Sequence, residues 1–117
     1  MDLEFYTVDV FSNKIFGGNP LAIFTNTDDI SADLMQSIAS EVNYSETVFI
    51  QKPKNKDNTA KVKIFTPKNE LPFAGHPNVG AGFLLSCFPN LIPGNYSKNK
   101  MVFEEIAGLV NVIPQYN

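Results

Sequence analysis

The sequence predicts an α+β fold in which a mixed, strongly curved β-sheet of about six strands wraps around a buried central helix. Three observations lead to this prediction. Short runs of aromatic and β-branched residues recur along the chain, as is typical of strands. One stretch has the spacing of an amphipathic surface helix, and residues 77–88 are apolar without a single charge. An uncharged helix is usually a buried one, and a curled sheet is the natural way to bury it.

The strands are expected where β-branched and aromatic residues cluster between turn signals. Pro67 should stop the fourth strand, and the last two should form a hairpin that turns around Ala107-Gly108. The six expected strands are Leu3–Phe11, Leu21–Phe24, Thr47–Ile50, Val62–Phe65, Met101–Glu104 and Leu109–Ile113.

Two helices are expected. Ser31 can cap a helix that runs to about Val42 and ends at Asn43. Its apolar residues at helical spacing should form one buried face: Leu34, Met35, Ile38, Ala39 and Val42. In the uncharged helix, Pro77 suits the first helical position because its missing N–H would have no partner there.

Composition narrows the classes of function. The chain has 117 residues, is 44% hydrophobic and is expected to form a single domain over residues 1–117. All nine positive charges are Lys, and the absence of Arg argues against a nucleic-acid partner. The lysines at 52, 54 and 56 are interrupted by polar residues, which favours a solvated loop. With no signal peptide and no long apolar run, we expect a cytoplasmic location and no membrane partner.

The most informative stretch is Phe65–Gly80, which delivers the only histidine, His76, to the start of the uncharged helix. Helix N-termini offer unpaired N–H groups and the positive end of a dipole, so they bind carboxylates and other anions. Gly75 would let a ligand approach the backbone closely. The alternative is a purely structural helix start with a core histidine.

Two further stretches carry candidate site residues. In Asn43–Ile50, Glu46 precedes apolar and β-branched residues, so it should sit where a strand begins. A carboxyl group at the edge of an apolar site can exchange protons near neutral pH; the alternative is an ordinary surface glutamate. In Asp9–Ala22, Asn19 could hold loops together or touch substrate, although a plain turn is the alternative. The glycines there match no phosphate-binding pattern.

In this order, the three stretches resemble the N-terminal half of the phenazine-biosynthesis PhzF-like family. That family reads roughly DVF…GNPLAV, a helix with M-Q-x-I-A-x-E-x-N, S-E-T-x-F and FTPxxELPFAGHPT. The helix here supplies Met35–Asn43, and Ser45-Glu46-Thr47 follows at once. The resemblance covers about residues 3 to 90, and this co-occurrence is far more specific than any single motif.

The resemblance implies a diaminopimelate-epimerase-like fold with two similar domains and the site in the cleft between them. It implies cofactor-free acid–base isomerisation of a small carboxylated substrate. Glu46 would take a proton from one carbon and return it to another. The expected substrate-binding residues are Gly75, His76, Pro77 and Asn19. No metal and no cofactor are expected.

Racemases of this fold use two cysteines, one of them directly before the glycine of the helix start. Ala74 stands at that position here, so two-thiol chemistry is not expected. The single cysteine, Cys87, is expected to be a packing residue. Two positions depart from the family pattern: Asn78 replaces the usual Thr, and Lys63 stands where many members carry Arg.

The resemblance covers only an N-terminal half, and the second domain would carry further site residues. Three interpretations follow. The chain is a fragment of a longer enzyme, or it pairs with itself as a homodimer or with a complementary second-domain chain, or it is a non-catalytic binding or structural remnant. Unpaired sheet edges would favour association in either of the first two.

Overall fold

The computed structural model describes residues 3–10, 19–96 and 100–113, and for Val10 and Asn19 it describes the backbone alone. The described part contains seven strands, two α-helices and one short 3₁₀-helix. In chain order they are β1 (Glu4–Val10), β2 (Asn19–Thr25), α1 (Ala32–Val42), β3 (Glu46–Gln51), β4 (Ala60–Phe65), β5 (Glu70–Leu71), α2 (Gly75–Cys87), η1 (Pro89–Leu91), β6 (Met101–Glu105) and β7 (Gly108–Val112).

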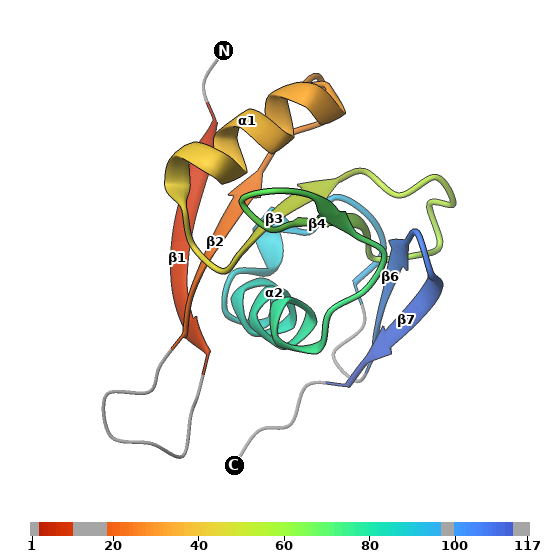
Figure 1. Ribbon diagram of the computed structural model, residues 1–117. Coiled ribbons are helices and arrows are strands. Elements are labelled where there is room, and N and C mark those ends of the chain that lie inside the picture. Colours follow the sequence, from red (N-terminus) through yellow and green to blue (C-terminus); the bar gives the residue numbers. More distant parts are fainter. Residues whose placement is uncertain (1–2, 11–18, 97–99, 114–117) are drawn as a thin grey trace.

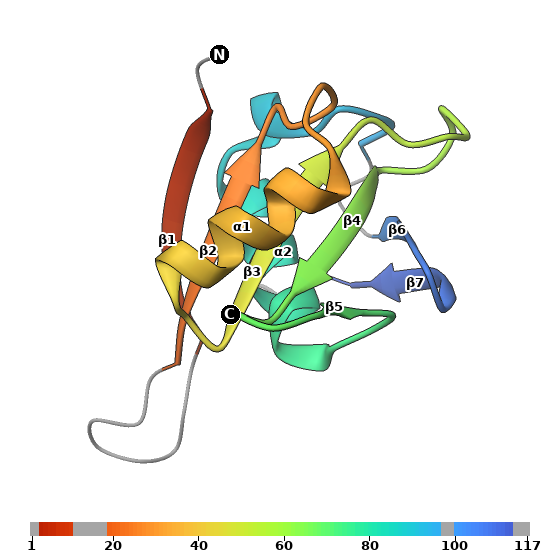
Figure 2. The ribbon, with the colours of Figure 1, turned by 45° about the horizontal axis from the view of Figure 1, so that its top comes forward.

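One mixed sheet organises the molecule. Its strand order is β1-β2-β3-β4-β6-β7, with β5 paired to β4 off this path. The β2–β3 and β4–β6 pairs are parallel and the others are antiparallel. The sheet curves around α2, and α1 lies on its outer side (Figures 1 and 2). The predicted α+β class, with a curved mixed sheet around a central helix, is confirmed.

Strand β3 is buried on both faces because a helix lies on each side of the sheet. Successive strand residues point to opposite faces. Val48 and Ile50 therefore join the core shared with α2, whereas Phe49 joins the core shared with α1. Full burial of each such side chain contributes about 1.5–3 kcal/mol to folding. This alternation decides which way Glu46, at the start of β3, can point.

Helix α1 forms as its capping signals predict. The Ser31 side-chain oxygen accepts a hydrogen bond from the Leu34 N–H at 3.1 Å, and Asn43 adopts a left-handed conformation with φ 59° after the last helical residue. Met35 and Ala39 are buried. Leu34 was expected on the buried face but is 43% exposed, because it lies at one edge of the apolar stripe.

Helix α2 begins two residues earlier than predicted. Ala74 is its N-cap and Gly75 its first residue, so Pro77 occupies the third helical position and not the first. The predicted helical position of Pro77 was wrong, but the expectation that a proline fits the start of this helix was correct. The N–H groups throughout the first turn lack helical partners, so a proline is tolerated anywhere within it.

One side of α2 is open, contrary to the prediction of a fully buried helix. Val79 and Phe83, one turn apart, are 60% and 61% exposed, and Cys87 at the end of the helix is exposed as well. The prediction that Cys87 packs in the core was therefore wrong. The reason is geometric: the sheet wraps only part of the circumference of α2, and these residues recur at helical spacing on the uncovered side.

Two short elements escaped prediction. β5 is two residues long and pairs with β4 through Leu71–Ile64 and Glu70–Phe65. η1 is a single turn. Neither is long enough to show a periodic hydrophobic pattern. Within the described residues, neither helix has the length and hydrophobicity needed to cross a membrane.

Candidate active site

Glu46 is the first residue of β3 and is half-buried. By strand alternation its side chain shares a face with Val48 and Ile50, which is the face that packs against α2. On the neighbouring strand its register partner is the buried Leu21. The carboxyl group thus lies on the inner side of the sheet, next to apolar side chains, as predicted for a strand start at the edge of an apolar site.

Among the described residues, the backbone N–H groups of Gly75 and His76 at the start of α2 have no hydrogen-bond acceptor. The cap residue Ala74 makes no side-chain hydrogen bond to the helix, and the first turn contains no acidic residue. N–H groups of the first turn lack helical acceptors, and proline has no N–H, so Gly75 and His76 supply the free donors. Both residues are exposed, and a Cβ atom built on Gly75 would meet no atom within 4 Å. This open, uncapped helix start can receive an anion.

Sheet pairing brings Glu46 and the start of α2 to the same end of the molecule. Thr47 pairs with Phe65 of β4, and Phe65 pairs with Glu70 of β5, five residues before the first residue of α2, Gly75. The beginnings of β3 and α2 lie at the same end of the sheet in Figure 2. A carboxyl group and an open, uncapped helix start therefore lie at one edge of the inner face.

Asn19 and Pro77, the other two predicted site residues, are less open to a ligand in the described structure or are described only in part. Asn19 opens β2 and lies two residues before Leu21, so its backbone is at the same end of the sheet. Its side chain, and the preceding Gly17-Gly18 loop, lie outside the described residues. Pro77 is buried, in contrast to its exposed neighbours Gly75 and His76.

Sequence reasoning missed Glu105, which lies beside the first turn of α2. The Asn78 side-chain amide donates to the Glu105 carboxylate at 3.3 Å and to the Ala74 carbonyl at 3.1 Å. Burial raises the pKa of Glu105 to about 7, and the hydrogen bond from Asn78 only partly opposes this. The one available signal was alternation, since Met101, Phe103 and Glu105 share a strand face and the first two are buried.

Lys63 forms an ion pair with Glu70 across β4 and β5. The Nζ–Oε2 distance is 3.7 Å, and the two side chains are 20% and 23% exposed. This distance suits an ion pair but is too long for a hydrogen bond. A single long contact fits a lysine, which lacks the paired donors of the arginine common in the resembled family.

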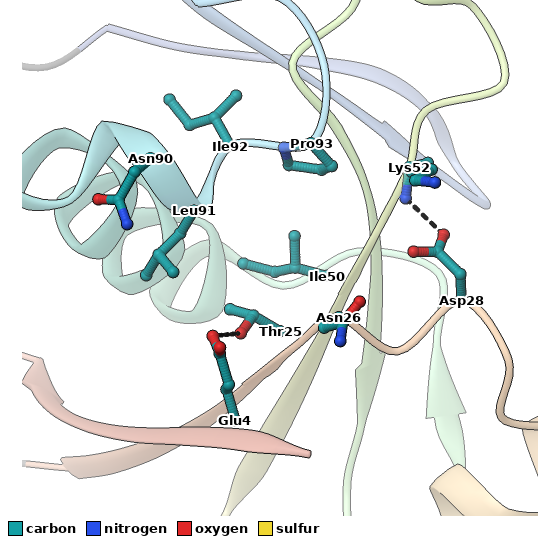
Figure 3. A pocket seen from close by; sticks show the side chains of 10 residues that line it. All are labelled: Glu4, Thr25, Asn26, Asp28, Ile50, Lys52, Asn90, Leu91, Ile92 and Pro93. Carbon is teal, nitrogen blue, oxygen red and sulfur yellow. Dashed lines mark hydrogen bonds between the residues drawn. The ribbon is translucent and has the colours of Figure 1, made fainter. Parts of the chain in front are cut away.

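Two cavities lined by described residues flank the sheet. One, of about 280 Å³, is lined by Glu4, Thr25, Asp28, Ile50, Lys52 and the 90–93 segment (Figure 3). It lies at the far end of β3, about 13 Å from Glu46 at the usual strand rise, and contains none of the predicted site residues. The other, of about 320 Å³, lies between β4 and β6 and includes Lys63, Glu70 and Glu105. Within the described residues no cluster of three metal-ligating side chains occurs.

Comparison with known proteins places this arrangement in a family. The model of the phenazine biosynthesis-like proteins (PhzC–PhzF) matches residues 8–117. The chain belongs to the PhzF family. The crystal structure of a PhzF-family phenazine biosynthesis protein from Bacillus anthracis superposes with a TM-score of 0.82 and 28% identity, over 100% of this chain and 38% of that one.

Two curated relatives show the range of names within the family. Antisense-enhancing sequence 1 of Schizosaccharomyces pombe is 46% identical over 93% of this chain and 36% of its own length. Trans-2,3-dihydro-3-hydroxyanthranilate isomerase of Pseudomonas aeruginosa is 44% identical over 70% of this chain and 29% of its own length. The chain therefore spans about a third of the length of the curated relatives that it matches.

Proposed function

We propose that this PhzF-family chain supplies the acid–base half of a cofactor-independent isomerase. Glu46 is the proton carrier, and the start of α2 binds the carboxylate of a small substrate through the N–H groups of Gly75 and His76. The observation that carries the proposal is the placement of a half-buried carboxyl group and an open, uncapped helix start at one end of the same sheet face.

The chemistry needs only a proton shift. The Glu46 carboxylate removes a proton from one carbon, and the electron pair of the broken C–H bond delocalises into the adjacent unsaturated system. The resulting Glu46 carboxylic acid then returns the proton to a different carbon, which regenerates the carboxylate and yields the isomer. The helix start favours this step because its N–H groups and dipole stabilise negative charge on the substrate.

A proton-exchange assay tests the role of Glu46. The substrate probe is trans-2,3-dihydro-3-hydroxyanthranilate, the compound named for the Pseudomonas relative, incubated in D₂O and followed by ¹H NMR. Removing a positioned acid–base group typically costs 10²–10⁴-fold in rate, and we expect a loss of that size for Glu46→Gln. Glu41→Gln is the matched control because Glu41 is an exposed carboxylate on α1.

The assay is run on the chain alone and with the remaining two-thirds of a PhzF relative supplied as a second chain. Deuterium incorporation that is equal in the wild type and in Glu46→Gln, in both arrangements, would refute the catalytic role. Incorporation only with the second chain would support the proposal and show that the site needs completion.

We infer further that the open side of α2 is covered in the active assembly, by a second copy of this chain or by a complementary second-domain chain. Large apolar side chains are exposed there on and near the helix: Phe73, Val79 and Phe83. Exposed apolar patches of this kind mark association surfaces. The alternative, a non-catalytic binding module, predicts association without any Glu46-dependent proton exchange.

A further inference from the structure

Asn78 links the start of α2 to the end of β6. Asn78 is 4% exposed. Its side-chain amide nitrogen donates one hydrogen bond to the Ala74 carbonyl and another to Glu105 Oε1. Ala74 is the cap residue of α2, and it has no capping side chain of its own. The Asn78 amide therefore performs two tasks: it holds the cap carbonyl, and it ties the first turn to β6.

The contact leaves two oxygens without donors. Asn78 Oδ1 and Glu105 Oε2 are both buried, and neither has a hydrogen-bond partner among the described residues. They are the oxygen of the amide and the second oxygen of the carboxyl group, and these two groups already share a hydrogen bond. If Glu105 were ionised, both would be acceptors, and a buried acceptor without a donor costs about 1–3 kcal/mol.

One proton resolves this mismatch. A neutral carboxylic acid has one acceptor oxygen and one O–H donor, and an amide has the complementary N–H donor and C=O acceptor. Placed side by side, the two groups can form a ring closed by two hydrogen bonds, Nδ2–H to Oε1 and Oε2–H to Oδ1. The observed Nδ2–Oε1 contact is one half of such a ring.

We propose that Glu105 is a positioning residue: as a neutral carboxylic acid it closes a two-hydrogen-bond ring with the amide of Asn78, and this ring fixes the first turn of α2, which carries Gly75 and His76. A second backbone contact supports the same junction, because the Ala107 N–H donates to the Pro72 carbonyl at 3.2 Å. The inference rests on the proposed function, since the position of this turn matters to catalysis only if the turn binds substrate.

The charged neighbours of Glu105 leave its proton in place. Lys61 and Lys63 line the same cavity from β4, Lys54 from the loop before it, Glu70 from β5 and Glu104 from β6. Lys63 is engaged by Glu70. Desolvation raises the pKa of Glu104, but hydrogen bonds from the 54–58 loop outweigh it and hold that pKa below its usual value. Among the described residues no lysine forms an ion pair with Glu105.

The ring should open as pH rises through the titration of Glu105. Ionisation removes the Oε2–H donor and leaves two buried acceptor oxygens, Glu105 Oε2 and Asn78 Oδ1, facing each other without a proton between them. The first turn of α2 should therefore loosen. Glutamine cannot ionise, and its amide offers the same donor and acceptor as the neutral acid. Glu105→Gln should therefore keep the ring closed at every pH, whereas Glu105→Ala should remove it.

NMR titration of this chain tests the proposal without any substrate. In the His76→Gln background, which removes the other side chain of this turn that can take up a proton, we expect the Glu105 carboxyl carbon and the Asn78 amide signals to titrate with one shared midpoint near pH 7. Glu105→Gln should abolish the Asn78 titration. Glu105→Ala should speed hydrogen exchange of the 78–80 amides about 30-fold at pH 6, the factor expected for two lost hydrogen bonds of about 1 kcal/mol each.

Two outcomes would overturn the proposal: Asn78 signals that do not change with pH, or a midpoint near pH 7 that persists in Glu105→Gln. Because no readout involves Glu46 or a substrate, the ring can be found where proton exchange fails, and proton exchange can be found where the ring fails. The two proposals are thus tested separately.

Discussion

At position 75 the requirements of the fold and of the proposed chemistry can be separated. A Cβ atom there meets nothing within 4 Å, and alanine is a better helix residue than glycine. We expect Gly75→Ala to leave the free energy of unfolding within about 0.5 kcal/mol of wild type. The methyl group should obstruct the free N–H groups of the helix start and slow deuterium exchange into the probe at least about tenfold. Urea unfolding and the exchange assay measure the two effects.

Gly94→Ala is the matched glycine control. A Cβ atom at Gly94 would lie 2.6 Å from the Thr59 carbonyl oxygen and closer still to that of Asn58. Backbone atoms cannot move aside easily, so this variant should lose about 1–3 kcal/mol of stability. If Gly75→Ala lost as much as Gly94→Ala, the open space at the helix start would be refuted.

At Thr47, next to Glu46, a substitution is expected to increase the stability of the fold. It is fully buried, its Oγ1 has no described hydrogen-bond partner, and alternation points it toward α1 with Phe49, away from Glu46. Thr47→Val replaces an unpaired buried hydroxyl with a methyl group of similar shape. We expect a gain of about 1 kcal/mol, or a Tm increase of about 3–5 °C, with unchanged proton exchange. A decrease in Tm would mean that the hydroxyl has a partner.

The junction of β6 with α2 predicts how stability depends on pH. The pKa of Glu105 is raised from 4.5 to about 7 in the folded chain, so the folded state holds a proton that the unfolded state releases between these values. The contribution of Glu105 to the free energy of unfolding should therefore be fully present below about pH 4.5, fall as pH rises and be lost above about pH 7. Because the side chain is partly exposed to solvent, we expect a loss of only about 1 kcal/mol.

Urea unfolding at pH 5, 6, 7 and 8 measures this dependence. Glu105→Gln should lack the fall, so it should match wild type at pH 5 and exceed it at pH 8. Glu41→Gln, which removes an exposed carboxylate, should keep the wild-type profile. Parallel profiles for wild type and Glu105→Gln would contradict the assignment.

The elements that the sequence predicted are those with a strong local signal. Ser31 and Asn43 delimit α1 because both cap the helix through local interactions: Ser31 through its side-chain oxygen and Asn43 through its left-handed backbone conformation. The start of α2 was misplaced because Pro77 is tolerated throughout a first turn, so its presence does not fix the first residue. β5 was missed because two paired residues leave no periodic pattern, and its existence depends on β4.

The candidate site was partly accessible from sequence. Glu46, Gly75 and His76 stand in motifs that are contiguous along the chain, so a resemblance could single them out as candidate site residues. The Asn78–Glu105 contact could not be foreseen, because it joins residues 27 positions apart through the curvature of the sheet. Likewise, the hydrophobic character of Val79 and Phe83 predicted burial, but burial depends on how far the sheet wraps around α2.

At the scale of the whole molecule, the described residues form a curved sheet with two unpaired edges and a central helix that is uncovered on one side. β1 and β7 end the described strand order, and free strand edges favour pairing with other chains. The same molecule exposes Phe73, Val79 and Phe83, the last two on one face of α2. A sheet that wraps a helix incompletely thus leaves apolar surface beside the proposed site, and covering that surface would exclude water from the substrate.

Phe83→Asp tests whether this surface is an interface. Phe83 is 61% exposed, so the substitution removes little of the core and should change the free energy of unfolding by less than about 1 kcal/mol. We expect the wild-type chain to form a dimer, or a complex with the supplied second-domain chain, in size-exclusion chromatography with light scattering. Phe83→Asp should shift both toward monomer, because a buried, unpaired carboxylate is costly at an interface.

Ser37→Asp, an exposed substitution on α1, should leave association unchanged. A wild-type chain that stays monomeric alone and with the second domain would show that the open side of α2 is not an association surface, and would leave Glu46 in half a site.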